Sequence, residues 1–234
     1  ISPYVYCMNN PIRYVDPDGR KIKIANHVDR AMNNIAQIAA TSMGGKVINN
    51  LIAQNETYTL NSANFFFNSD YNSHNRTISY VGNTMIRRIE GGAFNSMLAM
   101  GHEMMHGYDH STTPRLFRSD EQVAAASGTL EGRAVSFGNY LRSAYSLYPL
   151  RDSYGTLDEN FHQFSTNGEK ISDFTSLGNN SDKTAYGYSY TKTITKNTYN
   201  KWGFVTKSTV TSSQTYYMIV NRDKDNNVTY QIYN

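Results

Sequence analysis

The hydrophobic pattern of this chain changes its period part-way along the 234 residues. Between residues 26 and 155, apolar side chains recur at helical spacing, as in Val28, Ala31 and Ile35. Between residues 183 and 234, Thr, Tyr and Ser alternate with apolar residues or lysine, which is the period-2 pattern of strands. Helical and strand patterns in separate regions are typical of the α+β class, so we expect a largely helical core followed by a β-rich extension.

Composition shifts divide the chain further. Residues 1–20 contain Pro11 and the turn sequence Asp-Pro-Asp-Gly at 16–19, so we expect an extended segment. Residues 21–155 form the expected core, and the Gly/Asn/Ser/Asp-rich residues 156–182 predict a linker or loop. The pattern predicts helices over 28–38, 46–53, 93–106 and 130–145, strands over 57–60 and 77–81, and a break at Gly44-Gly45. A hairpin is predicted around residues 225–227.

Overall composition excludes several classes of protein. With 22 Lys+Arg against 19 Asp+Glu, the formal net charge of +3 gives no reason to expect a nucleic-acid partner. The single cysteine, Cys7, allows neither an internal disulfide nor a zinc site built from cysteines. Apolar runs stay far below the ~20 residues of a membrane-spanning helix, so no membrane span is expected.

One motif in the predicted 93–106 helix has the residue types of a metal-dependent catalytic site, namely His102-Glu103-Met104-Met105-His106. Residues i and i+4 lie one above the other on a helix face, so His102 and His106 can bind one metal ion. Catalytic zinc uses three protein ligands and a water, and it lowers the pKa of that water to about 7. Glu103 stands beside the first histidine, where its carboxylate can take the proton of the water. The motif therefore predicts a Zn²⁺ hydrolase site.

The third metal ligand is less constrained by spacing. Glu131 lies 25 residues after His106 and flanks the apolar stripe of the next predicted helix, where a carboxylate has a reason to exist if it meets a cation. It could instead be an ordinary glutamate near a helix N-terminus. The other candidates are His110, Asp120 and Glu121, whereas Asp109 better suits a role behind the ligands.

Further features bear on catalysis and substrate binding. Tyr154, in Arg151-Asp152-Ser153-Tyr154-Gly155, could donate a hydrogen bond to a tetrahedral oxyanion, as could Arg151. A strand at 77–81 before the motif could form a sheet edge that holds an extended peptide. Residues 183–234 carry seven Lys/Arg and two Asp/Glu, so a basic surface beside the cleft would favour acidic substrates. The alternative is a solvated sheet whose lysines only discourage edge pairing.

Two stretches resemble known protein families. Residues 4–19, YVYCMNNPIRYVDPDG, resemble the segment that closes the RHS/YD-repeat core, after which a variable toxin domain follows. This resemblance implies that residues 1–20 end an RHS core. It also implies that the rest is a toxin, secreted or delivered into a target cell, with a cognate immunity protein as a partner.

Residues 26–155 resemble the NleD-like effector zinc metalloproteases through Gly-His-Glu-Met-Met-His at 101–106 and LEGRAVSFGNYLR at 130–142. The resemblance implies a zincin-like metallopeptidase core and supports Glu131 as the third zinc ligand. Together the residues predict a zinc endopeptidase acting on a target-cell protein. Two alternatives stay open: a zinc amidase acting on cell-wall peptides, and a non-catalytic binding module at the tip of an RHS protein.

Overall fold

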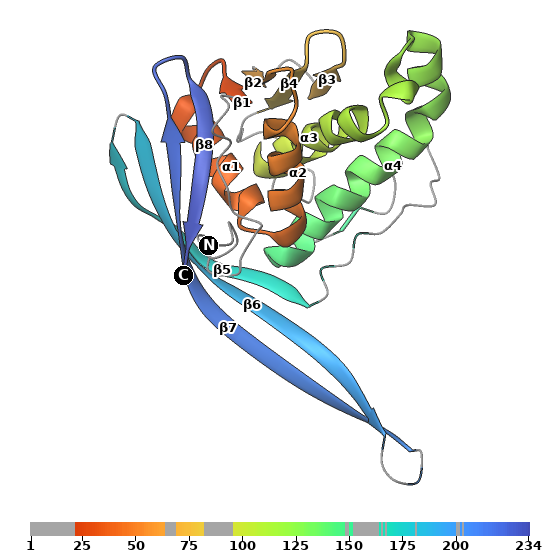
Figure 1. Ribbon diagram of the computed structural model, residues 1–234, viewed down its shortest axis with the longest axis vertical. Coiled ribbons are helices and arrows are strands. Elements are labelled where there is room, and N and C mark those ends of the chain that lie inside the picture. The colour runs from red at the N-terminus through yellow and green to blue at the C-terminus, as the bar shows by residue number, and fades with distance from the viewer. Residues whose placement is uncertain are drawn as a thin grey trace, which may run out of the picture.

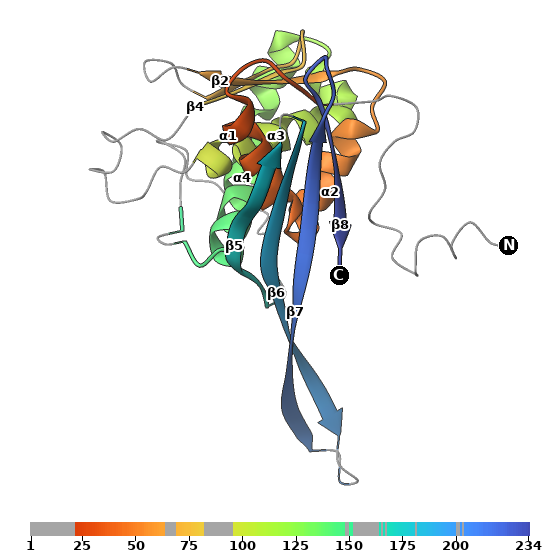
Figure 2. The same ribbon diagram turned by 90° about the vertical axis from the view of Figure 1, so that its left-hand side faces the viewer.

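The part of the chain that the structure describes folds as one mixed sheet with four α-helices on one side of it (Figures 1 and 2). The computed structural model describes residues 22–63, 69–81, 96–147, 150–151, 164, 166, 168–180, 182–199, 202 and 204–234. Its eight strands follow the order β3-β4-β2-β1-β8-β7-β6-β5. The strands are β1 (Ile22–Ile24), β2 (Tyr58–Ala63), β3 (Asp70–Asn72), β4 (Thr77–Val81), β5 (Glu169–Asn180), β6 (Lys183–Tyr199), β7 (Val205–Arg222) and β8 (Asn227–Tyr233). The mixture of helices and strands agrees with the expected α+β class.

The first two helices, α1 (Val28–Ala39) and α2 (Ser42–Ile52), meet at a sharp corner. The hydroxyl of Thr41 caps α2 by accepting a hydrogen bond from the Gly44 N–H at 3.1 Å. The helix break predicted at Gly44-Gly45 is wrong, because both glycines lie inside α2. A Cβ on Gly44 would stand 2.0 Å from the carbonyl oxygen of Ile38, so glycine is needed there for close packing of the corner.

The next two helices are longer than the sequence pattern predicted. Helix α3 (Ser96–Thr112) extends beyond the expected end at residue 106. Helix α4 (Asp120–Ala144) begins ten residues before the expected start, and the Ser119 hydroxyl caps it by accepting from the Gln122 N–H at 3.3 Å. The early part of α4 was missed because most of its residues before Leu130 are exposed and leave no apolar stripe to detect.

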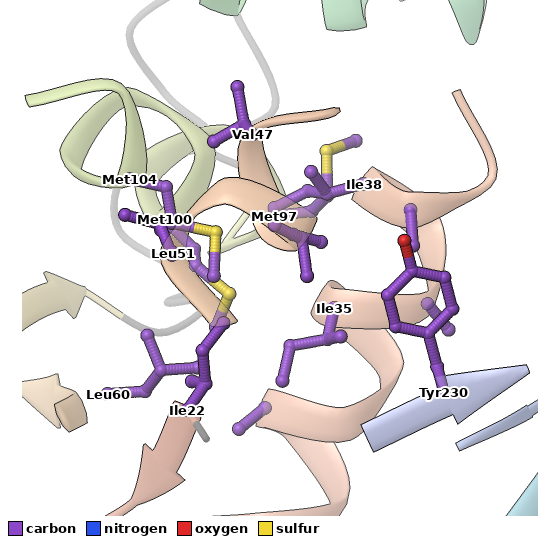
Figure 3. Packing of buried hydrophobic residues seen from close by; sticks show 14 of the residues in the cluster. Ile22, Ile35, Ile38, Val47, Leu51, Leu60, Met97, Met100, Met104 and Tyr230 are labelled. Atoms are coloured by element: carbon purple, nitrogen blue, oxygen red, sulfur yellow. The ribbon is translucent and has the colours of Figure 1, made fainter. Parts of the chain in front are cut away.

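The core lies between the sheet and the helices, where Figure 3 shows side chains of α1, α2 and α3 in one cluster. The buried methionines of α3 fill the space between the other helices and the strands, as unbranched, adaptable side chains can. Among the buried residues labelled in Figure 3 are Ile22, Ile35, Ile38, Val47, Leu51, Leu60, Met97, Met100, Met104 and Tyr230.

The C-terminal strands belong to the same sheet as the core. Strand β8 pairs antiparallel with β1, with Ile22 opposite Val228, and the Tyr230 hydroxyl donates to Asn49 of α2 at 2.8 Å. The loop predicted over 156–182 is wrong for Glu169–Asn180, which form β5. Most side chains of β5 are exposed, so the strand is held by its ladder with β6 rather than by an apolar face of its own. The predicted hairpin at 225–227 is confirmed, since β7 ends at Arg222 and β8 begins at Asn227.

Strands β6 and β7 continue far past the rest of the sheet (Figure 2). Strand β5 pairs with β6 as far as Lys192, and β8 pairs with β7 from Tyr217 onward. Beyond those points residues 193–199 and 205–211 pair with each other, and we call them, with Trp202 and Phe204, the distal arm. The arm points away from α3, so Lys196 and Lys207 of the arm lie far from the motif, whereas Lys183 and Arg222 lie at the other ends of the same two strands.

Candidate metal centre

Helix α3 presents His102 and His106 on one face, as the i, i+4 spacing predicted. Their ring centroids lie 5.1 Å apart with the rings nearly perpendicular, and both side chains are largely buried. Gly101 allows α3 to approach α4 at this level, since a Cβ there would stand 2.5 Å from Cδ1 of Leu141. The close approach brings the two imidazoles within reach of side chains on α4.

Glu131 of α4 completes the group. Its Oε2 lies 3.2 Å from Nε2 of His102, and its Oε1 lies 3.4 Å from Nε2 of His106. Two ligand atoms of a tetrahedral zinc, each about 2.05 Å from the metal, are about 3.4 Å apart. The ligand atoms of all three residues lie within 4.8 Å of one another, so the group could hold a metal ion. The structure thus brings together the three residues predicted as ligands.

The electrostatics of the three residues suit a cation. Burial alone would raise the pKa of Glu131, but hydrogen bonds with His102 and His106 outweigh it and hold that pKa well below its usual range. Burial lowers the pKa of His102 and favours the neutral imidazole that a metal needs. For His106, the neighbouring carboxylates of Glu131 and Glu103 overcome burial and raise the pKa. An extra positive charge is therefore stabilised at this point of the molecule.

Glu103 is buried beside the ligands, with 4% of its surface exposed. Burial raises its pKa to about 8, and His106 opposes the shift while Glu131 and Asp70 add to it. A divalent cation held by the neighbouring group would favour the carboxylate form and lower this pKa. A carboxyl group in this environment can exchange a proton near neutral pH, which is the property of a general base.

The other candidates for third ligand have different partners. His110 receives a hydrogen bond at Nδ1 from Arg76 at 3.1 Å, lies 2.8 Å from the Tyr71 hydroxyl, and stacks on Phe117. Because a guanidinium can only donate, Nδ1 must carry a lone pair that is already in use. Asp120 and Glu121 are exposed in the first turn of α4. None of the three lies in the metal-binding group.

Asp109 supports the site from behind. It lies one turn after His106 and is 2% exposed. Its carboxylate forms an ion pair with Arg133 of α4, whose Nε lies 2.9 Å from Oδ1 and 3.0 Å from Oδ2 and whose Nη2 lies 2.9 Å from Oδ1. Arg133 stands two residues after Glu131, so the pair fixes α4 against α3 next to the ligands. Sequence reasoning placed Asp109 behind the ligands but missed Arg133, because nothing in the spacing of the two residues reveals the pairing.

Of the two predicted oxyanion donors, only Arg151 is among the described residues. Tyr154 lies outside the described residues. The backbone N–H of Arg151 donates to Asn139 of α4 at 2.8 Å, which places this residue beside the middle of that helix. Burial is the main cause of the lowered pKa of His102, and the charges of His106 and Arg151 lower it further. Arg151 is thus close enough to act electrostatically on the candidate centre.

The strand predicted at 77–81 is confirmed as β4, but its expected place at the sheet edge is wrong where β3 covers it. Residues 70–72 of β3 pair antiparallel with residues 77–79 of β4. Within the described strands, β3 is therefore the edge on this side of the sheet. Its three residues, Asp70, Tyr71 and Asn72, were too few to show a period in the sequence.

A separate cavity of about 480 Å³ lies between α2, α4 and strands β6–β8, away from the metal-binding group. Its wall includes Glu169, whose carboxylate accepts from the Ser42 N–H at 2.7 Å and from the Tyr140 hydroxyl at 2.9 Å. These bonds join the start of β5 to α2 and α4. The aromatic residues that line the cavity are Tyr140, Phe164, Tyr188, Tyr190, Tyr216 and Tyr230.

Comparison of the chain with protein-family profiles, curated proteins and solved structures finds no match. The resemblances noted for residues 4–19 and 26–155 therefore stay predictions. Among the described helices, none combines the length and the hydrophobicity that crossing a membrane requires.

Proposed function

We propose that the chain is a zinc-dependent peptide hydrolase with a zincin-like core. The observation that carries the proposal is the convergence of His102, His106 and Glu131 from two helices, with their ligand atoms within 4.8 Å of one another. Two neutral nitrogens and one carboxylate form the donor set of the His₂Glu class of catalytic zinc site, which leaves a fourth position for water.

The residues of the chain divide the chemistry between them. Bound zinc would polarise the substrate carbonyl and lower the pKa of water. Glu103, buried next to the ligands, accepts the proton of the attacking water and passes it to the leaving amine. Arg151, whose charge acts on His102, would stabilise negative charge on the oxygen, and the same role for Tyr154 stays a prediction.

The biological setting rests on the sequence alone. The likeness of residues 4–19 to the end of an RHS core supports a toxin or effector that is secreted or delivered into a target cell, where it cleaves a protein. An amidase acting on cell-wall peptides would use the same four residues. The substrate, rather than the metal site, separates these two alternatives.

The test compares Glu103→Gln with Glu121→Gln, an exposed glutamate on α4. Zinc content is measured in both variants, and hydrolysis is followed on a quenched fluorescent peptide library and on purified cell-wall stem peptides. We expect Glu103→Gln to keep zinc and to lose hydrolysis by roughly 10²-fold or more, because only the base is removed. Glu121→Gln should behave as wild type. If Glu103→Gln loses its zinc, Glu103 is a ligand and the proposed division of roles is wrong.

A further inference from the structure

The distal arm ends in a cluster of apolar side chains that face water. Tyr199, Trp202, Phe204 and Val205 are 71%, 74%, 70% and 51% exposed. Large aromatic side chains stabilise a fold or an interface most when they are buried. An exposed group of them therefore marks a surface that binds another molecule or a membrane. The arm also projects well beyond the body of the molecule (Figure 2).

The charged residues in the sequence around this tip are all positive. Between Lys183 and Asn221 the sequence contains five lysines and no aspartate or glutamate. Lys196 and Lys207 lie on the exposed strands behind the tip, where their neighbours across the ladder are Ser208 and Asn197. With no carboxylate in this stretch of sequence to neutralise them, these lysines complement a negatively charged partner.

The shaft of the arm is mostly polar, with Ile194 and Val210 opposite each other as its exposed apolar pair. The hydroxyls of Thr193 and Thr211 lie 3.2 Å apart across the two strands, and the backbone ladder continues to Tyr199 opposite Val205. Seven residues of strand extend about 23 Å at ~3.3 Å per residue. The outer edges of a two-stranded ribbon carry unpaired backbone groups, so the shaft must stay in water and only its tip can enter an apolar phase.

We infer that the distal arm is a membrane-docking element, which places its aromatic tip in the interface of an anionic lipid bilayer. Trp and Tyr favour the boundary between headgroups and acyl chains, and lysines set behind them reach the anionic headgroups. A protein partner fits the geometry less well. A stable protein interface buries about 800 Å² on each side, whereas this apolar surface is a few side chains at the end of a narrow ribbon. The inference does not rest on the proposed hydrolase, because the arm lies at the opposite end of the molecule from α3.

Trp202 is the single tryptophan of the chain, so its fluorescence reports on the tip directly. The full chain is mixed with vesicles of phosphatidylcholine, with or without phosphatidylglycerol, and binding is followed by Trp emission and co-sedimentation. We expect a shift of the emission to shorter wavelength and co-sedimentation on the vesicles with phosphatidylglycerol. Both should weaken as salt is raised, because the lysine contribution is screened.

Two variants test the contacts while Trp202 is kept as the reporter. Each lysine near an anionic surface contributes about fivefold in affinity, so Lys196→Gln with Lys207→Gln should weaken binding by at least about tenfold. Phe204→Ser should reduce both the wavelength shift and co-sedimentation. The matched controls are Lys183→Gln, at the other end of β6, and Leu150→Ser, an exposed apolar residue outside the arm, and both should bind as wild type.

Three results would overturn the inference. The first is no binding to either kind of vesicle. The second is equal binding by the arm variants and the controls, which would place the contact elsewhere. The third is binding to polyglutamate without any shift of Trp202 emission on vesicles, which would assign the arm to an acidic protein.

Discussion

The α3–α4 pair and the distal arm depart from the usual pattern of burial in opposite ways, because the helix pair buries acidic residues and the arm exposes aromatic ones. In the helix pair, the charged residues Glu103 and Asp109 are 4% and 2% exposed. In the arm, Trp202 and Phe204 are 74% and 70% exposed. A buried charge or an exposed aromatic cluster is more informative than a buried leucine, because each costs free energy unless something compensates.

The compensation differs between the two regions. Around α3 and α4 it is present within the described chain, because Arg133 pairs with Asp109 and the charge of His106 opposes the effect of burial on the pKa of Glu103. At the tip of the arm, the exposure of the aromatic side chains shows that the described chain does not bury them. The comparison teaches that the first region is built to hold a charge internally, and the second is built to meet an external surface.

The largest effect on folding is expected at the ion pair behind the metal centre. Asp109→Asn leaves the Arg133 guanidinium facing an uncharged amide, and it should lower the free energy of unfolding by about 2–3 kcal/mol. Urea unfolding measures the change. The matched control is Asp225→Asn, an exposed aspartate, and its free energy of unfolding should stay within about 0.5 kcal/mol of wild type. Equal effects of the two substitutions would remove the contrast between buried and exposed charge.

The second prediction concerns pH. Burial first, and the charge of Arg76 next, lower the pKa of His110 to about 4. The unfolded chain, with a histidine pKa near 6.5, therefore binds more protons than the native state between pH 6.5 and pH 4. The stabilising contribution is complete above pH 6.5 and is lost as the pH falls through this window.

Unfolding at pH 7.5 and pH 5.0 tests this sign. Wild type should lose about 2 kcal/mol more between the two values than His110→Gln, which has no group to protonate there. His74→Gln is the control, because His74 is exposed and should leave the wild-type slope unchanged. A steeper slope in His110→Gln than in wild type would contradict the assignment.

The smallest effect is expected in the arm. Ile194 is 45% exposed and faces Val210 across the ladder, so Ile194→Thr should change the free energy of unfolding by less than about 0.5 kcal/mol. Ile171 of β5 is 5% exposed and belongs to the core, so Ile171→Thr should cost about 2 kcal/mol. If the arm substitution costs as much as the core substitution, the arm is part of the cooperative core and the comparison fails.

More of the candidate site than of the fold could be predicted from the sequence. The i, i+4 spacing fixed the two histidines on one face, and the position of Glu131 beside an apolar stripe brought it toward them. Strand β5 and the first ten residues of α4 gave no periodic signal, because they are held by a neighbouring strand and a cap rather than by a buried face of their own.

The arm shows a second limit of sequence reasoning. Alternation over 183–234 predicted strands, but nothing in it told where neighbouring strands stop pairing. Strand β5 begins at Glu169, opposite Lys192 of β6, and β8 ends at Tyr233, opposite Tyr217 of β7. These two strand ends decide that residues 193–199 and 205–211 project alone. Strand β8 pairs with β7 on one side, and its pairing with β1 on the other side depends on contacts between distant parts of the chain.

The zinc content of the purified chain tests the central claim most directly. Wild type should hold about one zinc per chain, His106→Ala almost none, and His74→Ala as much as wild type. Of the two substituted histidines, His106 belongs to the metal-binding group and His74 does not. Circular dichroism of His106→Ala establishes that the helices are still formed. Wild type without zinc, or equal zinc in His106→Ala and wild type, would contradict the account.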